Sequence, residues 1–133
     1  MRLWLLTAFI LFGLASCNKE KFEKELEGNY TGIFYRTAPL VNFPVQQVTL
    51  NLNDNIFSGA SGNARYPAIC HGNWEAGNST IEFENRCVWT ADFDWSLILD
   101  GEFRYEWNGT QLKLWQVKGE SEVTDWYVLE KVQ

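Results

Sequence analysis

The side chains best suited to chemistry in this sequence are three cysteines and a single histidine. Cys17 follows the apolar N-terminal stretch, whereas Cys70, His71 and Cys87 lie in the middle of the chain. The two later cysteines can form a disulfide, or they can join His71 in a metal site. A zinc site needs four ligands at a recognisable spacing, and a fourth ligand is not evident. The sequence therefore favours a disulfide over a metal site, provided that the chain leaves the cytoplasm, and it predicts no cofactor.

Candidate catalytic groups are sparse. No serine lies in a nucleophile elbow, and no glycine-rich phosphate loop is present. Asp92 and Asp94 are two residues apart and could form a calcium-binding corner or a glycosidase pair. Aspartates more often occupy loops between strands, so the sequence predicts no catalytic residue and no enzymatic activity.

Residues 1–16 have the features of a secretory signal. A positively charged start precedes an apolar run over residues 3–14, which is too short to span a membrane comfortably and ends in small residues. Residues 14–17, Leu-Ala-Ser-Cys, resemble the lipobox of bacterial lipoproteins, and the resemblance implies cleavage before Cys17 and acylation of its thiol. By the same resemblance, Asn18 in the next position implies the outer membrane. The alternative is an ordinary secretory signal followed by a chance cysteine.

The rest of the chain is acidic and long enough for one domain. The whole sequence carries a formal net charge of -6 at pH 7, which disfavours nucleic acid as a partner because phosphate binding requires a basic surface. This charge also gives no attraction to anionic lipids, so we expect membrane contact only through acyl chains on Cys17. We therefore divide the chain into a signal peptide (1–16), a lipidated cysteine with a tether (17–27) and a β-domain (28–133). Phe22 and Leu26 have the i,i+4 spacing of a short helix, and we expect the tether to become helical where it reaches the domain.

From residue 28 onward the pattern is that of β-structure. Apolar and polar residues alternate in several short segments, which gives each segment one dry and one wet face. Turn residues separate these segments, and no long amphipathic helix is evident. The predicted strands cover residues 29–36, 45–53, 55–60, 66–75, 80–88, 94–99, 102–107, 110–118 and 124–131.

Three tight turns set the register of neighbouring strands. They lie at Asp54–Asn55, Asp100–Gly101 and Asn108–Gly109, and such pairs suit hairpin turns because the central residues adopt positive φ. All three turns agree on which side chains form the dry face, as expected for consecutive hairpins. The cross-strand pairs that they predict are Leu52 with Phe57, Phe103 with Ile98, Tyr105 with Ser96, and Trp107 with Thr110.

A fourth turn links the hairpin pattern to the cysteines. Residues 78–79 lie midway between Cys70 and Cys87, so a hairpin that turns there sets the two cysteines directly opposite each other. The register predicts an inward-pointing disulfide with an aromatic residue beside it. It also sets Glu75 opposite Glu82, which costs some stability because like charges repel.

These hairpins predict an all-β fold, an up-and-down antiparallel meander of eight or nine strands that closes into a barrel without exposed edges. At this level the chain resembles the bacterial lipocalin-like lipoproteins, which are small calycin-type barrels. The resemblance rests on Gly28-Asn29-Tyr30, which is similar to the start of the first lipocalin strand, on residues 50–59, and on the closing residues 126–131. It implies a lipid-anchored envelope domain that binds a small apolar ligand.

Alternation also predicts which side chains point into the barrel. An eight-stranded barrel is wide enough either to be filled by its own side chains or to hold one small ligand. The inward residues are therefore ligand-binding candidates, with simple filling of the interior as the alternative. They are Tyr30, Phe34, Trp74, Phe83, Phe103, Tyr105, Leu112 and Leu114.

Two other functions remain open on the sequence alone. A filled barrel could be a protein-interaction module, such as an inhibitor or an accessory subunit of an envelope complex. It could also bind glycans through outward-facing Trp89, Trp95 and Trp115. The alternative for these tryptophans is that they pack beneath the loops over residues 37–44 and 118–123.

Overall fold

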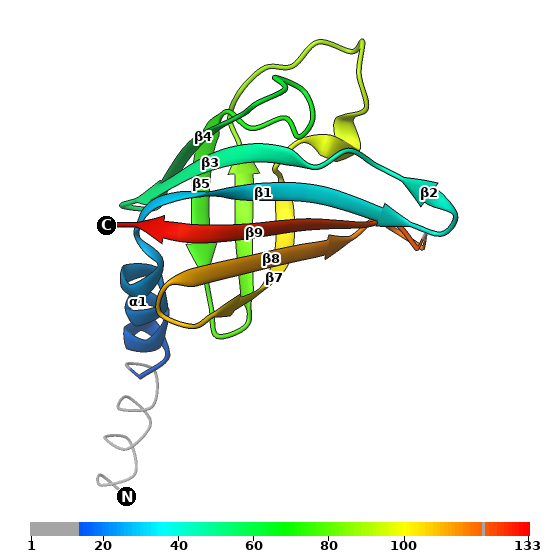
Figure 1. The fold of residues 1–133 in the computed structure, drawn as a ribbon. Coiled ribbons are helices and arrows are strands. Elements are labelled where there is room, and N and C mark those ends of the chain that lie inside the picture. The colour runs from blue at the N-terminus through cyan, green and yellow to red at the C-terminus, as the bar shows by residue number, and fades with distance from the viewer. Residues whose placement is uncertain (1–13, 121) are drawn as a thin grey trace, which may run out of the picture.

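The chain folds into a closed antiparallel barrel with a helix at one end (Figure 1). The computed structural model describes residues 14–120 and 122–133, so most of the predicted signal peptide lies outside the described residues. Among those residues, no helix combines the length and the apolar character needed to cross a bilayer. The elements are α1 (Leu14–Leu26), β1 (Gly28–Ala38), β2 (Val41–Asn42), β3 (Gln46–Asn53), β4 (Ile56–Ser61), β5 (His71–Ala76), β6 (Thr80–Asn85), the 3-10 helix η1 (Trp95–Leu97), β7 (Gly101–Trp107), β8 (Gln111–Val117) and β9 (Thr124–Val132).

Eight strands make the barrel wall. Each strand from β3 to β8 pairs with the next one along the chain, and β1 closes the barrel because it pairs with both β3 and β9. The closing ladder runs from Asn29 opposite Val132 to Thr37 opposite Thr124. This topology confirms the predicted up-and-down barrel. The ninth strand, the two-residue β2, was not expected and extends the β1 edge beyond β3.

The segment predicted to be a tether is helical. Residues 17–27 are rich in lysine and glutamate, which favour helices, and α1 spans nearly all of them. The helix therefore leads directly from the predicted acylation site into the barrel. Cys17 lies within α1, and its side chain is outside the described part of the structure.

Helix α1 covers one end of the barrel through a few specific contacts. Leu26 is buried in the core, and its carbonyl accepts a hydrogen bond from the Tyr30 hydroxyl at 2.6 Å. Glu23 holds the helix against the strand ends, because its carboxylate accepts from the Ala76 backbone N–H at 3.4 Å and from the Asn55 side-chain amide at 2.8 Å. The barrel is thus closed at this end by the residues that follow the predicted anchor.

The β3–β4 and β5–β6 hairpins have the predicted register. Leu52 pairs with Phe57, and the intervening Asp54 and Asn55 both have positive φ, as a type I′ turn requires. Strands β5 and β6 turn at residues 78–79, where the flanking residues are hydrogen-bonded backbone to backbone at 2.9 Å. Turn residues placed the first of these hairpins, and the midpoint between Cys70 and Cys87 placed the second.

The predicted strand over residues 94–99 is wrong. Residues 95–97 form the 3-10 helix η1 instead, and Asp94 caps it because its carboxylate accepts from the Ser96 backbone N–H at 2.9 Å. Such a local side-chain bond competes with an extended ladder. Leu97 and Leu99 are buried, whereas Ile98, which was predicted to face Phe103, is only half-buried.

The predicted Asp100–Gly101 hairpin is wrong for the same reason. Phe103 pairs with Ile81 of β6 rather than with Ile98, and Tyr105 does not face Ser96. Strands β6 and β7 are therefore direct neighbours. The residues between them form a long connection at the end of the barrel opposite α1 (Figure 1).

The β7–β8 register differs from the prediction by two residues. Trp107 pairs with Leu112, not with Thr110. The Asn108 side chain accepts from the two backbone N–H groups that follow Gly109, and Gly109 has φ 99, which suits the first central position of a type II′ turn. Because the shift is an even number of residues, the predicted inward face is preserved.

Candidate functional site

Aromatic side chains occupy the barrel interior. All eight residues predicted to point inward are buried. The rings of Phe57, Phe83, Phe103, Tyr127 and Phe34 form one continuous series across the barrel, in which each ring centroid lies 4.9 to 5.9 Å from the next. Rings at this spacing are in direct contact, so no ligand fits between them. The inward residues were predicted correctly, and in this structure they fill the interior.

Two buried polar atoms lack a hydrogen-bond partner among the described residues. They are the indole nitrogen of Trp74 and the hydroxyl of Tyr66. Trp74 is 2% exposed and is one of the predicted interior residues. Buried donors of this kind ordinarily bind an ordered water or another polar group. Trp74 is therefore the interior residue with an unused capacity to bind.

A buried ion pair closes the end of the barrel opposite α1. Arg36 and Asp125 are paired across β1 and β9, and their side chains are only 7% and 3% exposed. The Arg36 guanidinium donates to both carboxylate oxygens, at 2.6 and 3.0 Å, and the hydrogen bond to Asp125 raises the pKa of Arg36. Arg36 also donates to Asp94 at 3.2 Å and to the Ser96 hydroxyl at 3.0 Å. The pair thus ties the η1 segment to the barrel, and the sequence analysis did not single it out.

Asp92 and Asp94 have separate structural partners. Asp92 forms an ion pair with Arg65 at 2.7 Å, and hydrogen bonds from Thr90 and then Arg65 lower its pKa to about 2. The pKa of Asp94 is also lowered, chiefly by its hydrogen bond with Ser96. These contacts agree with the interpretation of both aspartates as loop residues.

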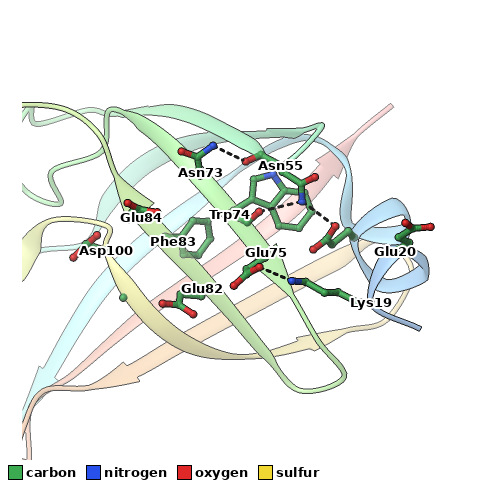
Figure 2. Close-up of a pocket in the computed structure, with 12 residues that line it drawn as sticks. Lys19, Glu20, Asn55, Asn73, Trp74, Glu75, Glu82, Phe83, Glu84 and Asp100 are labelled. Atoms are coloured by element: carbon green, nitrogen blue, oxygen red, sulfur yellow. Dashed lines mark hydrogen bonds and ion pairs between the residues drawn. The ribbon is translucent and has the colours of Figure 1, made fainter. Parts of the chain in front are cut away.

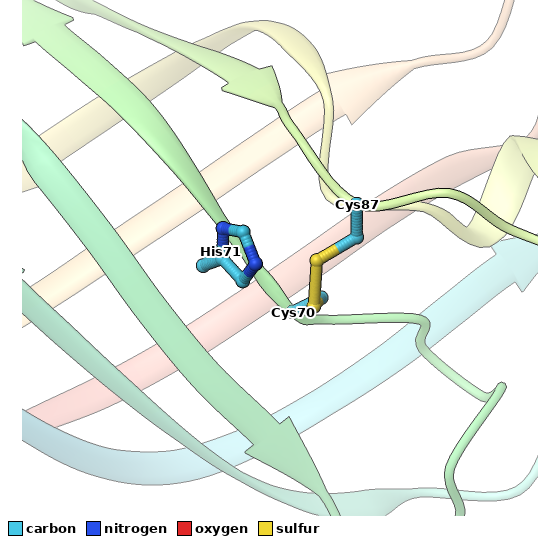
Figure 3. Close-up of side chains that lie close together, drawn as sticks. All are labelled: Cys70, His71 and Cys87. Carbon is cyan, nitrogen blue, oxygen red and sulfur yellow. A yellow bond between two sulfur atoms is a disulfide. The ribbon is translucent and has the colours of Figure 1, made fainter.

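Cys70 and Cys87 form the predicted disulfide (Figure 3). Their Cα atoms are 6.3 Å apart, and the bridge lies just beyond the paired ends of β5 and β6. Both cysteines are half-buried, so the bridge lies at the barrel wall rather than deep in the core. The exposed His71 ring lies within 4.8 Å of the sulfurs. Because each sulfur is bonded to the other, neither is available as a thiolate ligand.

An acidic groove lies beside α1 on the barrel (Figure 2). It has a volume of about 730 Å³ and is lined by residues of α1, β5 and β6, among them the buried Trp74 and Phe83. Beside it, Glu75 faces Glu82 and Glu82 faces Glu102 across three adjacent strands. Lys19 of α1 forms an ion pair with Glu75, and this hydrogen bond is the main cause of its raised pKa. The Lys19–Glu75 ion pair in this groove therefore helps to hold α1 against the barrel. The acidic charge of the groove does not by itself identify a ligand.

A row of aromatic rings crosses the outer face of β8, β9 and β1. Trp115 pairs with Trp126, and Trp126 pairs with Tyr35. The neighbouring rings are stacked, with interplanar angles of 25° and 11°, and all three are half-exposed. The Trp126 indole donates to the Thr37 hydroxyl, and the Lys113 ammonium lies 5.2 Å from the Trp126 ring. These contacts hold the aromatic row in one arrangement on the barrel surface.

The tryptophans that were predicted to face outward have different surroundings. Trp115 belongs to the aromatic row, Trp95 is exposed, and Trp89 packs edge-to-face against Phe93. Trp126 was not among them, although its position between two inward residues of β9 would have placed it outside. Alternation in the last strand was the signal that could have found it.

Comparisons with known proteins give no relative for this chain. No family model matches it. No curated protein matches it, and no solved structure does so either. A functional proposal must therefore rest on the sequence features and on the surfaces described above.

Proposed function

We propose that this chain is a lipid-anchored protein of the bacterial cell envelope, held in the outer membrane through Cys17. We further propose that its filled barrel binds another protein through the exterior of the barrel rather than in its interior. The lipobox-like residues 14–17 support the anchor. The disulfide supports a compartment outside the cytoplasm, because such bonds persist in oxidising environments. The proposal assigns the barrel the role of a rigid scaffold.

The observation that carries this binding mode is the aromatic series across the interior. A ligand inside the barrel would have to displace rings that are already in contact, such as Phe83 and Phe103 at 5.7 Å. Displacement would cost the contacts of a closely packed core. Recognition at the outer surface requires no such rearrangement, so the filled interior supports a protein-interaction module.

Native mass spectrometry of a soluble form that begins at residue 18 tests the binding mode. This form keeps the α1 residues that contact the barrel, including Lys19 and Glu23. We expect the mass of the unliganded chain and no uptake of fatty acids. A co-purified apolar molecule, or saturable uptake of such probes, would contradict a filled scaffold.

A small ligand in the interior is the second candidate function, and the unpartnered indole nitrogen of Trp74 favours it. If that nitrogen binds a ligand, a Trp74→Phe variant should lose the ligand in native mass spectrometry under conditions in which the variant is still folded. Leu112→Met, at another buried interior position, is the matched control. It changes the shape of the interior without removing a hydrogen-bond donor.

Glycan binding is supported by the aromatic row, because stacked half-exposed rings can hold a sugar ring. Titration of the soluble domain with envelope glycans, followed by tryptophan fluorescence, tests this alternative. A Trp126→Ala variant should lose the response, whereas replacing the exposed Trp95 by alanine should not alter it.

The anchor is tested separately with the full chain in bacterial cells. We expect the N-terminal peptide of the membrane-bound protein to begin at an acylated Cys17. A Cys17→Ala variant should accumulate with its signal uncleaved. Recovery of the unprocessed wild-type chain from the cytosol would contradict the proposed location.

A further inference from the structure

An apolar hairpin projects from the end of the barrel opposite α1 (Figure 1). Residues 38–45, here called the apolar hairpin, read Ala-Pro-Leu-Val-Asn-Phe-Pro-Val and include the turn between β1 and β2. Leu40 is fully exposed at 107%, and Val41 and Val45 are more than half exposed. A single exposed leucine is ordinary, but a projecting segment that exposes several apolar side chains is typical of a binding surface.

Leu40 also occupies a backbone position that suits glycine. Ala38 pairs with Val41, so Pro39 and Leu40 are the central residues of the turn. Leu40 has φ 60, as the second central residue of a type II turn, where glycine or asparagine is usual. Leucine in this conformation is strained, and its side chain gains no burial in return. The fold does not benefit from Leu40, which indicates a contact outside the chain.

The hairpin is restrained before it meets a partner. Pro39 lies in the turn and Pro44 lies just before β3, and each proline ring fixes its own φ. A segment that is already ordered loses less conformational entropy on binding. The apolar hairpin therefore presents Leu40 in a defined position.

The proposed anchor and the hairpin lie at opposite ends of the barrel. Strand β1 connects the two ends, and its eleven residues extend about 35 Å. Lys19, two residues after Cys17, already contacts Glu75 on the barrel, so no flexible linker separates the proposed acylation site from the domain. Acyl chains on Cys17 would therefore keep the α1 end near the membrane. The hairpin then faces away from the bilayer that holds the protein.

Acidic side chains border the hairpin. The loop between β8 and β9 lies beside it, because Thr124 pairs with Thr37 and Thr37 pairs with Asn42 of β2. Glu120 and Glu122 in that loop are exposed. An apolar tip beside carboxylates is repelled by anionic lipid headgroups, whereas it complements an apolar pocket with a basic rim.

We infer that the apolar hairpin docks into an apolar pocket of a second envelope protein. The Leu40 side chain fills this pocket, and basic residues surround it. The inference rests on the proposed function, since it assumes both the anchored orientation and a protein partner. It adds the place of contact and the chemistry of the partner's surface.

Photo-crosslinking of the anchored, full-length protein in its own cells is the first test. A photoreactive residue replaces Val41, and matched controls replace Thr49 on the outer face of β3 and Lys113 beside the aromatic row. We expect one discrete protein adduct from position 41, none from position 49, and loss of the adduct when Leu40→Asp is added. A lipid adduct, or an adduct that L40D does not weaken, would overturn the inference.

The two controls separate this inference from the proposed function. If position 41 gives no protein adduct but position 113 does, the hairpin inference fails and the proposed protein-interaction module stands. If neither position gives one, both fail. Either outcome is decisive because all variants carry the label at surface positions that leave the core unchanged.

Affinity measurements with the crosslinked protein, once it is identified and purified, are the second test. Leu40→Ala should weaken binding about 10- to 100-fold, as expected for loss of one buried leucine side chain. Leu40→Gly should weaken binding as much, while its melting temperature stays the same or rises because glycine relieves the strain at φ 60. A purely structural Leu40 would lower both quantities together. Unchanged affinity in L40A would overturn the inference.

Discussion

Replacing Asp125 by asparagine tests whether its ion pair with Arg36 holds the barrel end opposite α1 together. Asparagine has nearly the shape of aspartate, so the variant removes a charge and creates no cavity. Arg36 would keep its contact with Asp94 at 3.2 Å, but the Asp94 side chain is 57% exposed. The variant therefore leaves a guanidinium that is 7% exposed without a buried counter-charge.

The expected loss follows from the burial of the pair. Removing one partner of a buried ion pair typically costs about 3 to 5 kcal/mol, because the remaining charge stays desolvated. Asp94 offers partial compensation, so we expect the lower end, about 3 kcal/mol. A double variant, Arg36→Met with Asp125→Leu, replaces both charges by apolar side chains of similar size. It should recover most of the loss.

Urea unfolding of the soluble domain measures both effects. At a slope of about 1.5 kcal/mol per molar urea, a loss of about 3 kcal/mol lowers the midpoint by about 2 M. Asp92→Asn is the control, since it removes an exposed ion pair with Arg65 and should barely move the midpoint. The reasoning is refuted if D125N behaves like D92N, or if the double variant is as unstable as D125N.

Three further predictions concern the disulfide, the acidic groove and the buried tyrosines. Replacing Cys70 and Cys87 by alanine should cost roughly 3 kcal/mol of unfolding free energy, because the bridge spans a sequence separation of 17; free thiols in protein taken from the envelope would contradict the pairing. Glu82→Gln should raise the unfolding free energy by about 0.5 kcal/mol, because it interrupts three glutamates in one cross-strand row, and a gain that persists in high salt would argue against this cause. Burial raises the pKa of Tyr30 and Tyr127 above the ordinary 10.0, so their contribution to stability is complete below pH 10 and is lost as the pH rises above it. The tyrosinate absorbance that Tyr30→Phe and Tyr127→Phe variants lack should therefore appear together with loss of the β circular dichroism signal, and ionisation of both residues in an intact fold would disprove their burial.

The side chains that face inward could be predicted because strand alternation has a period of two. The positions of Phe34, Trp74 and Leu114 inside the barrel follow from this pattern alone. The even shift of the β7–β8 register left the same faces inward, which is why a wrong pairing did not change the predicted core. Turn residues such as Asp54 add register where their side chains match one turn type.

The errors arose where local hydrogen bonds outweigh the pattern. Residues 94–99 were predicted to extend as a strand, but the cap from Asp94 turns residues 95–97 into a 3-10 helix. At the next turn, the Asn108 side chain binds the backbone and moves the central residues forward by one. Both effects depend on side-chain geometry that composition and periodicity do not contain.

The candidate surfaces were harder to predict because they depend on contacts between distant strands. Arg36 and Asp125 occupy inward positions, but a charged residue there is plausible only once β1 and β9 are known to pair. The stacking of Trp126 between Trp115 and Tyr35 requires the same pairing. The strained backbone of Leu40 becomes visible only when the turn type is known.

The last ladder of the barrel has a consequence for how the polypeptide is exported. Strands β1 and β9 pair at nine positions, between segments that are about a hundred residues apart in the chain. Closure must therefore wait until β9 has been synthesised, and until then one edge of β1 has no partner. If the chain crosses the inner membrane unfolded, as the proposed signal peptide implies, this delay would keep the barrel from closing before export. At the proposed location the sheet would close after export, where oxidation of the cysteines also becomes possible.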